Sequence, residues 1–264
     1  MLSNKHDLYN KKKGGYIMKK NLVCLSSLLI LGGSIGMLSV QAEEASYTSQ
    51  GSVTFEQDTS KTDPVDPLNP DKPVIPTDPD GNETPDKGTA GPLSLDFASD
   101  FLFGTQKITT TDQDYYAKLQ SYKKEGETTL STGPNYIQVT DKRGTQLGWS
   151  LSVTQQEQFK TADEEVLEGA VITFNNATAV SSVDSAYAPT INAGGATELK
   201  LVPGSQQPVM TAAEKQGMGT WLYRLGDETT ADKSVKLSIP GKSVKLAKEY
   251  TTTLTWTLAS TPEK

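Results

Sequence analysis

Two Trp-x-Leu pairs are the residues of this chain best suited to recognition chemistry. Trp149 and Leu151 form the first pair, and Trp256 and Leu258 form the second, near the last residues. Both pairs lie in stretches where mainly apolar residues alternate along the chain, which predicts β-strands with one apolar face. An indole ring packs equally well on sugar rings and on apolar protein surface. The paired motif therefore favours a binding module over an enzyme.

A structural role for these side chains fits the same pattern. Aromatic residues are strand formers that bury large areas, and alternation does not tell which face of a strand looks inward. The third tryptophan, Trp221, is predicted to belong to the core. The predicted ligand-binding set is Trp149, Leu151, Tyr250, Trp256 and Leu258.

Residues 1–42 have the pattern of a leader that carries a secretory signal peptide. Lysines precede an uncharged run from Leu22 to Val40, and cleavage is expected after Ala42. Acidic residues follow that point instead of a basic stop-transfer flank, so we expect a secreted chain with no membrane insertion after cleavage. A purine-rich coding stretch before Met18 suggests the hypothesis that translation naturally starts there.

Removal of the leader also removes two residue types that many active sites need. The only histidine, His6, and the only cysteine, Cys24, both precede the cleavage point. Ser-His and Cys-His catalysis, the usual His/Cys zinc sites and disulfides are therefore excluded from the mature chain. We predict no catalytic residues, no metal and no cofactor.

The charge of the mature chain is strongly acidic. Of 25 basic and 32 acidic residues, the leader holds six lysines and one aspartate, which leaves 19 against 31 and a net charge of −12. Such a chain is a poor ligand for polyanions. We expect no nucleic-acid partner.

Two segments are expected between the leader and the main domain. Residues 43–56 include the alternating stretch Gly51–Phe55, which is predicted to be a short added strand. Residues 57–90 are predicted to be an extended acidic spacer, because prolines recur there at the three-residue period of polyproline II. These prolines are Pro64, Pro67, Pro70, Pro73, Pro76 and Pro79.

Residues 91–264 are predicted to fold as one all-β domain, sandwich-like or barrel-like. Asp141–Gly144 is expected to close a hairpin, because turn residues there separate two alternating runs. The best predicted strands are Leu93–Phe97, Ile137–Val139, Leu147–Val153, Ala170–Phe174, Leu199–Leu201, Val235–Ile239 and Tyr250–Leu258.

A local duplication forms the only strongly basic stretch of the acidic protein. The sequence Lys-Ser-Val-Lys-Leu occurs at residues 233–237 and again at 242–246. Its lysines could hold phosphates of a wall polymer. Alternatively, exposed lysines on a strand prevent edge-to-edge aggregation, which is the interpretation we favour.

The motifs together resemble a known family. The segment Trp149–Leu151 and the segment Tyr250–Pro262 are similar to the two signature motifs of the WxL-domain surface proteins of low-GC Gram-positive bacteria. Similarity extends to Gly91–Gly104, to Gly219–Trp221 and to the signal peptide with its acidic proline spacer. The resemblance implies non-covalent attachment to the cell wall through peptidoglycan. It also implies association with companion surface proteins, including membrane-anchored ones.

We therefore expect a non-catalytic surface protein that binds peptidoglycan at the cell wall. Docking onto a companion surface protein through the same Trp-x-Leu strands is an alternative within binding. The alternative from another class is a wall-glycan hydrolase, for which the densest acidic cluster is Asp163, Glu164, Glu165 and Glu168. That cluster shows no recognisable acid and base pair, so a solvated charged face is the better interpretation.

Overall fold

The computed structural model describes residues 44–84, 88–192 and 198–260. The leader expected over residues 1–42 lies outside these ranges. The chain divides into two units, Met1–Ser52 and Val53–Lys264. Among the described residues, no helix is long and apolar enough to cross a membrane.

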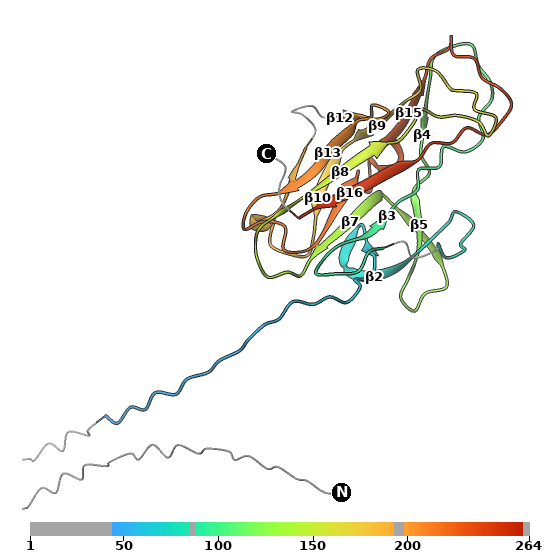
Figure 1. Ribbon diagram of the computed structural model, residues 1–264. Coiled ribbons are helices and arrows are strands. Elements are labelled where there is room, and N and C mark those ends of the chain that lie inside the picture. Colours follow the sequence, from blue (N-terminus) through green and yellow to red (C-terminus); the bar gives the residue numbers. More distant parts are fainter. Residues whose placement is uncertain (1–43, 85–87, 193–197, 261–264) are drawn as a thin grey trace, which may run out of the picture. The chain divides into compact units, whose positions relative to one another are not determined.

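The second unit is built from antiparallel strands in four sheets of four (Figure 1). Sheet I has the order β11, β13, β8, β16, with bounds Thr190–Ile191, Gln206–Ala212, Trp149–Gln155 and Leu254–Ala259. Sheet II has the order β10, β14, β7, β3, with bounds Ala177–Val180, Gly219–Leu225, Asn135–Asp141 and Leu93–Ala98. Two short 3-10 helices, Ser185–Tyr187 and Ala231–Lys233, lie in the connections.

The other two sheets complete the fold. Sheet III has the order β12, β9, β15, β4, with bounds Glu198–Lys200, Val171–Asn175, Val235–Ile239 and Gln113–Tyr116. Sheet IV has the order β1, β2, β5, β6, with bounds Val65–Asp66, Asn69–Thr77, Gln120–Lys124 and Leu130–Gly133. The all-β prediction is confirmed, and the described strands form a sandwich-like arrangement without a closed barrel.

One apolar core joins sheets I, II and III. Trp149 of sheet I, Trp221 of sheet II and Phe174 of sheet III are each at most 2% exposed. Val235, Leu237 and Ile239 alternate inward along β15, as period-two patterning requires. The prediction that Trp221 is core is confirmed.

The expected spacer contains a paired strand. Residues 74–77 of β2 pair antiparallel with β5, and a buried Asp66 accepts a hydrogen bond from Tyr122 Oη at 3.0 Å. The spacer prediction is therefore wrong for residues 65–77. Polyproline II and β backbones are both extended, and proline is tolerated wherever its missing N–H is not needed by the ladder. The spacing of the prolines alone could not distinguish a polyproline II segment from a β-strand.

The short strand expected at Gly51–Phe55 is not present. Residues 44–59 carry no regular secondary structure, and all of their side chains are exposed. A strand needs a neighbour for its backbone hydrogen bonds, and none of the described residues pairs with this stretch.

The hairpin expected at Asp141–Gly144 is also wrong, because β7 belongs to sheet II and β8 to sheet I. Arg143 organises this crossing. Its guanidinium bonds both carboxylate oxygens of Asp141, at 2.9 and 2.7 Å, and also donates to the carbonyls of Gly148 and Ser260. The side chain thereby ties the start of β8 to the end of β16.

Gly148 lets the chain enter β8 close to a neighbouring backbone. Its φ is +74°, and a Cβ at this position would collide with the carbonyl oxygen of Ala212. Only glycine fits there, because both the dihedral and the space exclude a side chain.

We predict that Gly148→Ala lowers the free energy of unfolding by more than about 2 kcal/mol, since strain and a backbone clash add up. Gly144→Ala is the matched control. Its φ is +68°, but a Cβ there would meet nothing within 4 Å, so the cost should be about 1 kcal/mol. Urea unfolding of the two variants measures the difference, and equal losses would contradict the steric argument.

Candidate functional site

Trp149 and Leu151 lie in the interior of the domain. Both side chains have 0% exposure, and Trp149 Nε1 donates a hydrogen bond of 2.9 Å to the carbonyl oxygen of Gly217. Because β8 runs between β13 and β16, neither edge of this strand is free. The direct ligand contact predicted for these two residues does not fit the structure, since no polymer reaches a side chain without exposed surface.

Trp256 and Leu258 lie on β16, the outer strand of sheet I, and are half-buried. The indole of Trp256 stacks on Phe174, with ring centroids 6.2 Å apart and planes 11° from parallel. It also lies tilted against Tyr223 at 6.4 Å. One face of Trp256 therefore completes the core, where three sheets meet.

The two motifs are neighbours in the sheet. In the antiparallel register, Leu258 lies opposite Leu151 and Trp256 lies opposite Val153. Thr255 and Thr257 are exposed on the other face of β16, so the apolar side of the strand points toward the core. The signature motifs thus hold β8 and β16 together through cross-strand apolar pairs.

Tyr250 lies just before β16 and is half-buried. Its hydroxyl accepts a hydrogen bond of 2.9 Å from the backbone N–H of Leu246. The residues that follow are fixed to the segment after β8: Thr251 and Lys160 exchange backbone hydrogen bonds of 2.9 and 3.0 Å. This pairing holds the tyrosine in place at the end of the domain.

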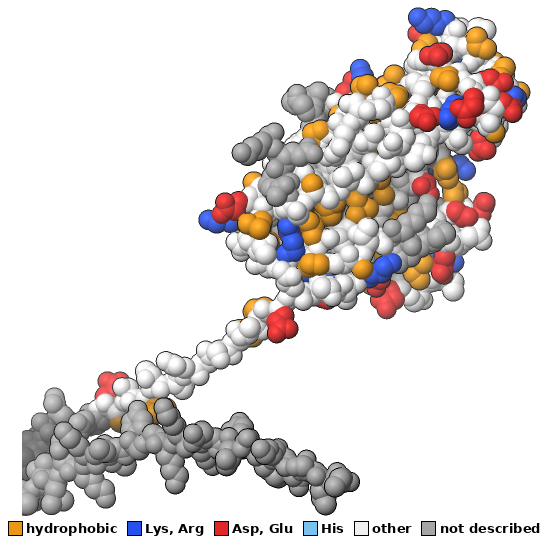
Figure 2. Space-filling view, viewed as in Figure 1, with side chains coloured by type: hydrophobic (Ala, Val, Ile, Leu, Met, Phe, Trp, Pro, Cys, Tyr) orange, Lys and Arg blue, Asp and Glu red, His pale blue; other side chains and the backbone are white. Residues whose placement is uncertain are grey.

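A groove of about 2590 Å³ runs past these residues. Its lining includes β16 with residues 245–253 and β3 with residues 99–108, and it continues along β2 and β5 of sheet IV. Figure 2 shows hydrophobic side chains gathered on the face where Figure 1 places β16, β7 and β3. Of the predicted ligand-binding set, Tyr250, Trp256 and Leu258 line the groove, whereas Trp149 and Leu151 do not.

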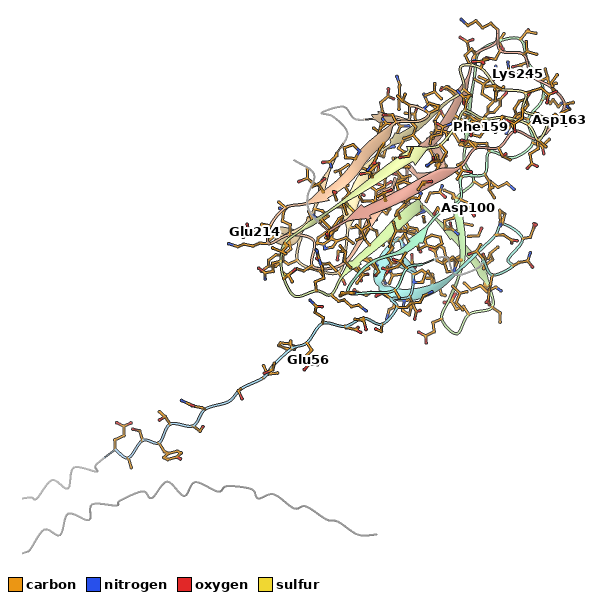
Figure 3. The ribbon with its side chains drawn as sticks, in the orientation of Figure 1. Glu56, Asp100, Phe159, Asp163, Glu214 and Lys245 are labelled. Carbon is orange, nitrogen blue, oxygen red and sulfur yellow. The ribbon has the colours of Figure 1, made fainter. Side chains whose placement is uncertain are left out.

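Two parts of the groove lie along β16 and the residues that precede it. The strand cleft is the part between β3 and β16, lined by Leu93, Leu95, Leu254, Trp256 and Leu258. The loop end is the part lined by Leu102, Phe103, Ile108, Phe159, Leu246 and Tyr250. Figure 3 shows Phe159 and Lys245 at one end of the domain, with Asp163 nearby and Asp100 farther toward the middle.

The second wall of the groove was not among the predicted site residues. Phe101 packs edge-on against Phe174 at 5.3 Å, and Phe103 packs against Phe159 at 6.4 Å. A signal was present, because Phe97, Phe101 and Phe103 are closely spaced in a segment similar to the family. Only the tertiary arrangement shows that this segment faces β16.

Lysines form ion pairs with three members of the acidic cluster beside the loop end, Asp163, Glu164 and Glu165. Lys248 Nζ lies 2.7 Å from an Asp163 carboxylate oxygen and 3.2 Å from one of Glu165, and these contacts raise the pKa of Lys248. Hydrogen bonds from Thr161 and Lys248 lower the pKa of Glu165. No group of three or more His, Cys, Asp or Glu suited to a metal occurs among the described residues.

The duplicated lysine stretch does not form one basic surface. Its first copy overlaps β15, an inner strand of sheet III, so protection of a sheet edge is the wrong explanation for Lys236. Lys236 Nζ lies 3.3 Å from Asp114, and Lys245 Nζ donates to the carbonyls of Pro240 and Ser243 at 2.9 and 3.1 Å. These two lysines already have partners within the domain.

We predict that Trp149→Ala costs about 3–5 kcal/mol of stability, because it removes a fully buried indole. Trp256→Ala should cost less, since part of that ring is exposed, while Trp256→Phe should keep most of the stacking on Phe174. Chemical unfolding gives these differences. A Trp149→Ala chain that unfolds like the parent would contradict the structural role.

Comparison with known protein families identifies the family of this chain. The chain matches the family model of the WxL domain, described as surface cell wall-binding, over residues 42–262. Neither the search of curated proteins nor the search of solved structures finds a match. The family match covers well over half of the 264 residues and includes both Trp-x-Leu strands. The chain therefore belongs to the WxL-domain family of cell wall-binding surface proteins.

Proposed function

We propose that this chain attaches to the Gram-positive cell surface by binding peptidoglycan non-covalently, without catalysis, at the loop end of the groove. Cell-wall binding follows from the family. The observation that carries the finer proposal is the aromatic and apolar lining around Tyr250, at the mouth of a groove far larger than a small-molecule pocket of roughly 300–1,000 Å³. A long open groove suits a polymer.

The chemistry of the loop end fits an amphiphilic glycan strand. Tyr250 and Phe103 present half-buried rings, and sugar rings stack on such faces. Ile108 and Leu246 are 57% and 37% exposed in the same lining, and apolar surface of this kind marks an interaction site. Polar backbone and side-chain groups of residues 245–253 border these rings and can hydrogen-bond sugar hydroxyls or the stem peptide.

A hydrolase has less support than a binding protein. A glycosidase needs a carboxylic acid with a raised pKa facing a second carboxylate. In the acidic cluster the pKa of Glu165 is lowered instead, and Asp163 and Glu165 share Lys248 as an ion-pair partner. Burial does raise the pKa of Asp96, but Ser94, Gln138 and Thr140 all donate hydrogen bonds to this carboxylate. A structural role accounts for Asp96.

Docking onto a companion surface protein is the second candidate. It is favoured by the position of β16 at the end of sheet I, where a strand from a partner can extend the sheet. Under this alternative the chain would be retained by intact walls and not by peptidoglycan freed of protein.

Tyr250→Ala is predicted to weaken sedimentation with protein-free peptidoglycan about tenfold or more, because it removes an aromatic anchor. Tyr250→Phe keeps the ring and should bind nearly as the parent does. Tyr187→Ala is the matched control, since this tyrosine is 41% exposed and does not line the groove. Circular dichroism must show all three variants folded. A folded Tyr250→Ala chain with unchanged binding would exclude the loop end, and a parent retained only on intact wall would exclude peptidoglycan as the direct ligand.

Salt dependence separates stacking from phosphate binding. An acidic domain that binds an anionic wall through aromatic contacts should bind equally well or better as ionic strength rises and screens repulsion. Replacing Lys233, Lys236 and Lys242 with Gln should then leave binding unchanged. A steep loss of binding with salt that these substitutions abolish would assign the contact to wall-polymer phosphates.

A further inference from the structure

The segment 45–55 has the pattern of a strand with one apolar face but has no sheet. Its even-numbered residues are all serine, threonine or glutamine, while the other side includes Tyr47, Val53 and Phe55. These three side chains are 95%, 76% and 88% exposed. The odd-numbered side is apolar at four of its six positions, with Ser49 and Gly51 as the exceptions, and the stretch carries no charge. This pattern is typical of a half-buried strand. The segment therefore lacks the partner that its sequence requires.

The strand cleft borders a strand edge that has no pairing partner. Among the described residues, β16 pairs only with β8, and its other edge borders the cleft. Natural edge strands are commonly protected by charged residues or proline. The six residues of β16 include neither. The edge of β16 therefore lacks the usual protection against pairing with another strand.

The segment is long enough to cover β16, and the two patterns match. Eleven extended residues span about 36 Å, more than the roughly 20 Å of β16. A strand added beside β16 would place one face on the apolar cleft lining and the other beside the exposed Thr255 and Thr257. The face with Tyr47, Val53 and Phe55 suits the lining, and the serine and threonine face suits the threonines.

The contact that fixes Gln57 argues against insertion of residues 45–55 into the strand cleft of the same copy. Gln57 Nε2 donates a hydrogen bond of 3.0 Å to the carbonyl of Arg143, and Arg143 bonds the carbonyl of Ser260, at the end of β16. A segment that ends at this anchor could run along the β16 of its own copy only in parallel. All strand pairs of sheet I are antiparallel, and parallel pairs are less stable per residue. A segment from another copy is free to enter antiparallel.

We propose that residues 45–55 of one copy insert as an antiparallel strand beside β16 in the strand cleft of a second copy. Each copy then offers a strand and accepts one through different surfaces. Such a head-to-tail contact yields a ring where the rotation between copies closes and a linear assembly where it does not. The assembly goes beyond wall binding and does not depend on peptidoglycan being the wall ligand.

The test compares substitutions on the two faces of the segment. Val53→Asp combined with Phe55→Asp places charge on the apolar face, and Ser52→Asp combined with Thr54→Asp places the same charge on the polar face. Light scattering after size exclusion should show concentration-dependent oligomers for the parent chain and for the polar-face variant. The apolar-face variant should be monomeric at the same concentrations, with unchanged circular dichroism.

A synthetic peptide of residues 44–56 locates the accepting surface. It should bind the apolar-face variant, whose cleft is empty and which cannot donate its own strand, and a peptide with Val53→Asp should bind at least tenfold more weakly. Trp149 and Trp221 are at most 2% exposed, so acrylamide quenching of fluorescence reports mainly Trp256. Bound peptide should reduce that quenching.

Three outcomes would overturn the proposal. If the parent chain stays monomeric and does not bind the peptide, while the apolar-face variant binds it, then residues 45–55 occupy the strand cleft of the same copy. Failure of the apolar-face variant to bind the peptide would show that the cleft accepts no such strand. Oligomers that persist in the apolar-face variant would place the contact elsewhere.

Discussion

Burial of β8 between β13 and β16 is the constraint on which the rest of the domain depends. Trp149, Leu151 and Val153 have no exposed surface, and the partners they need come from three sheets. The hydrophobic effect is the dominant favourable term in folding, so a chain without disulfides must obtain its stability from such a centre. The groove is a consequence of the same packing, because Trp256 reaches the core from the last strand and leaves the outer edge of that strand open.

Local alternation predicted several strands well and their pairing poorly. Val235–Ile239 forms a strand with the expected bounds and inward faces, because one side of β15 is buried. The crossing from β7 to β8 could not be read from turn residues, since it depends on Arg143 bonding groups that are distant in sequence. The proline-rich segment was misassigned because its pairing with β5 is also a long-range event.

The candidate site could be predicted only in part for a related reason. Sequence spacing identified both Trp-x-Leu strands, and the structure places them side by side in one sheet. It could not tell that Trp149 is enclosed and Trp256 is half-buried, because that depends on which strand is central and which is at the edge. The wall formed by residues 99–108 becomes part of the site only through packing such as that of Phe103 on Phe159.

The two proposed contacts use different parts of the groove and support each other energetically. Peptidoglycan would occupy the loop end around Tyr250, while the strand of a neighbouring copy would occupy the cleft beside β16. When several copies are linked, each further binding event becomes intramolecular, and overall avidity can exceed a single affinity by about 10²–10⁴ without any new contact. A modest aromatic site is then sufficient for stable attachment, because the wall is a repeating polymer and the assembly repeats the site. A strong individual site would be unnecessary, which fits a loop end lined by half-buried rings instead of a closed pocket.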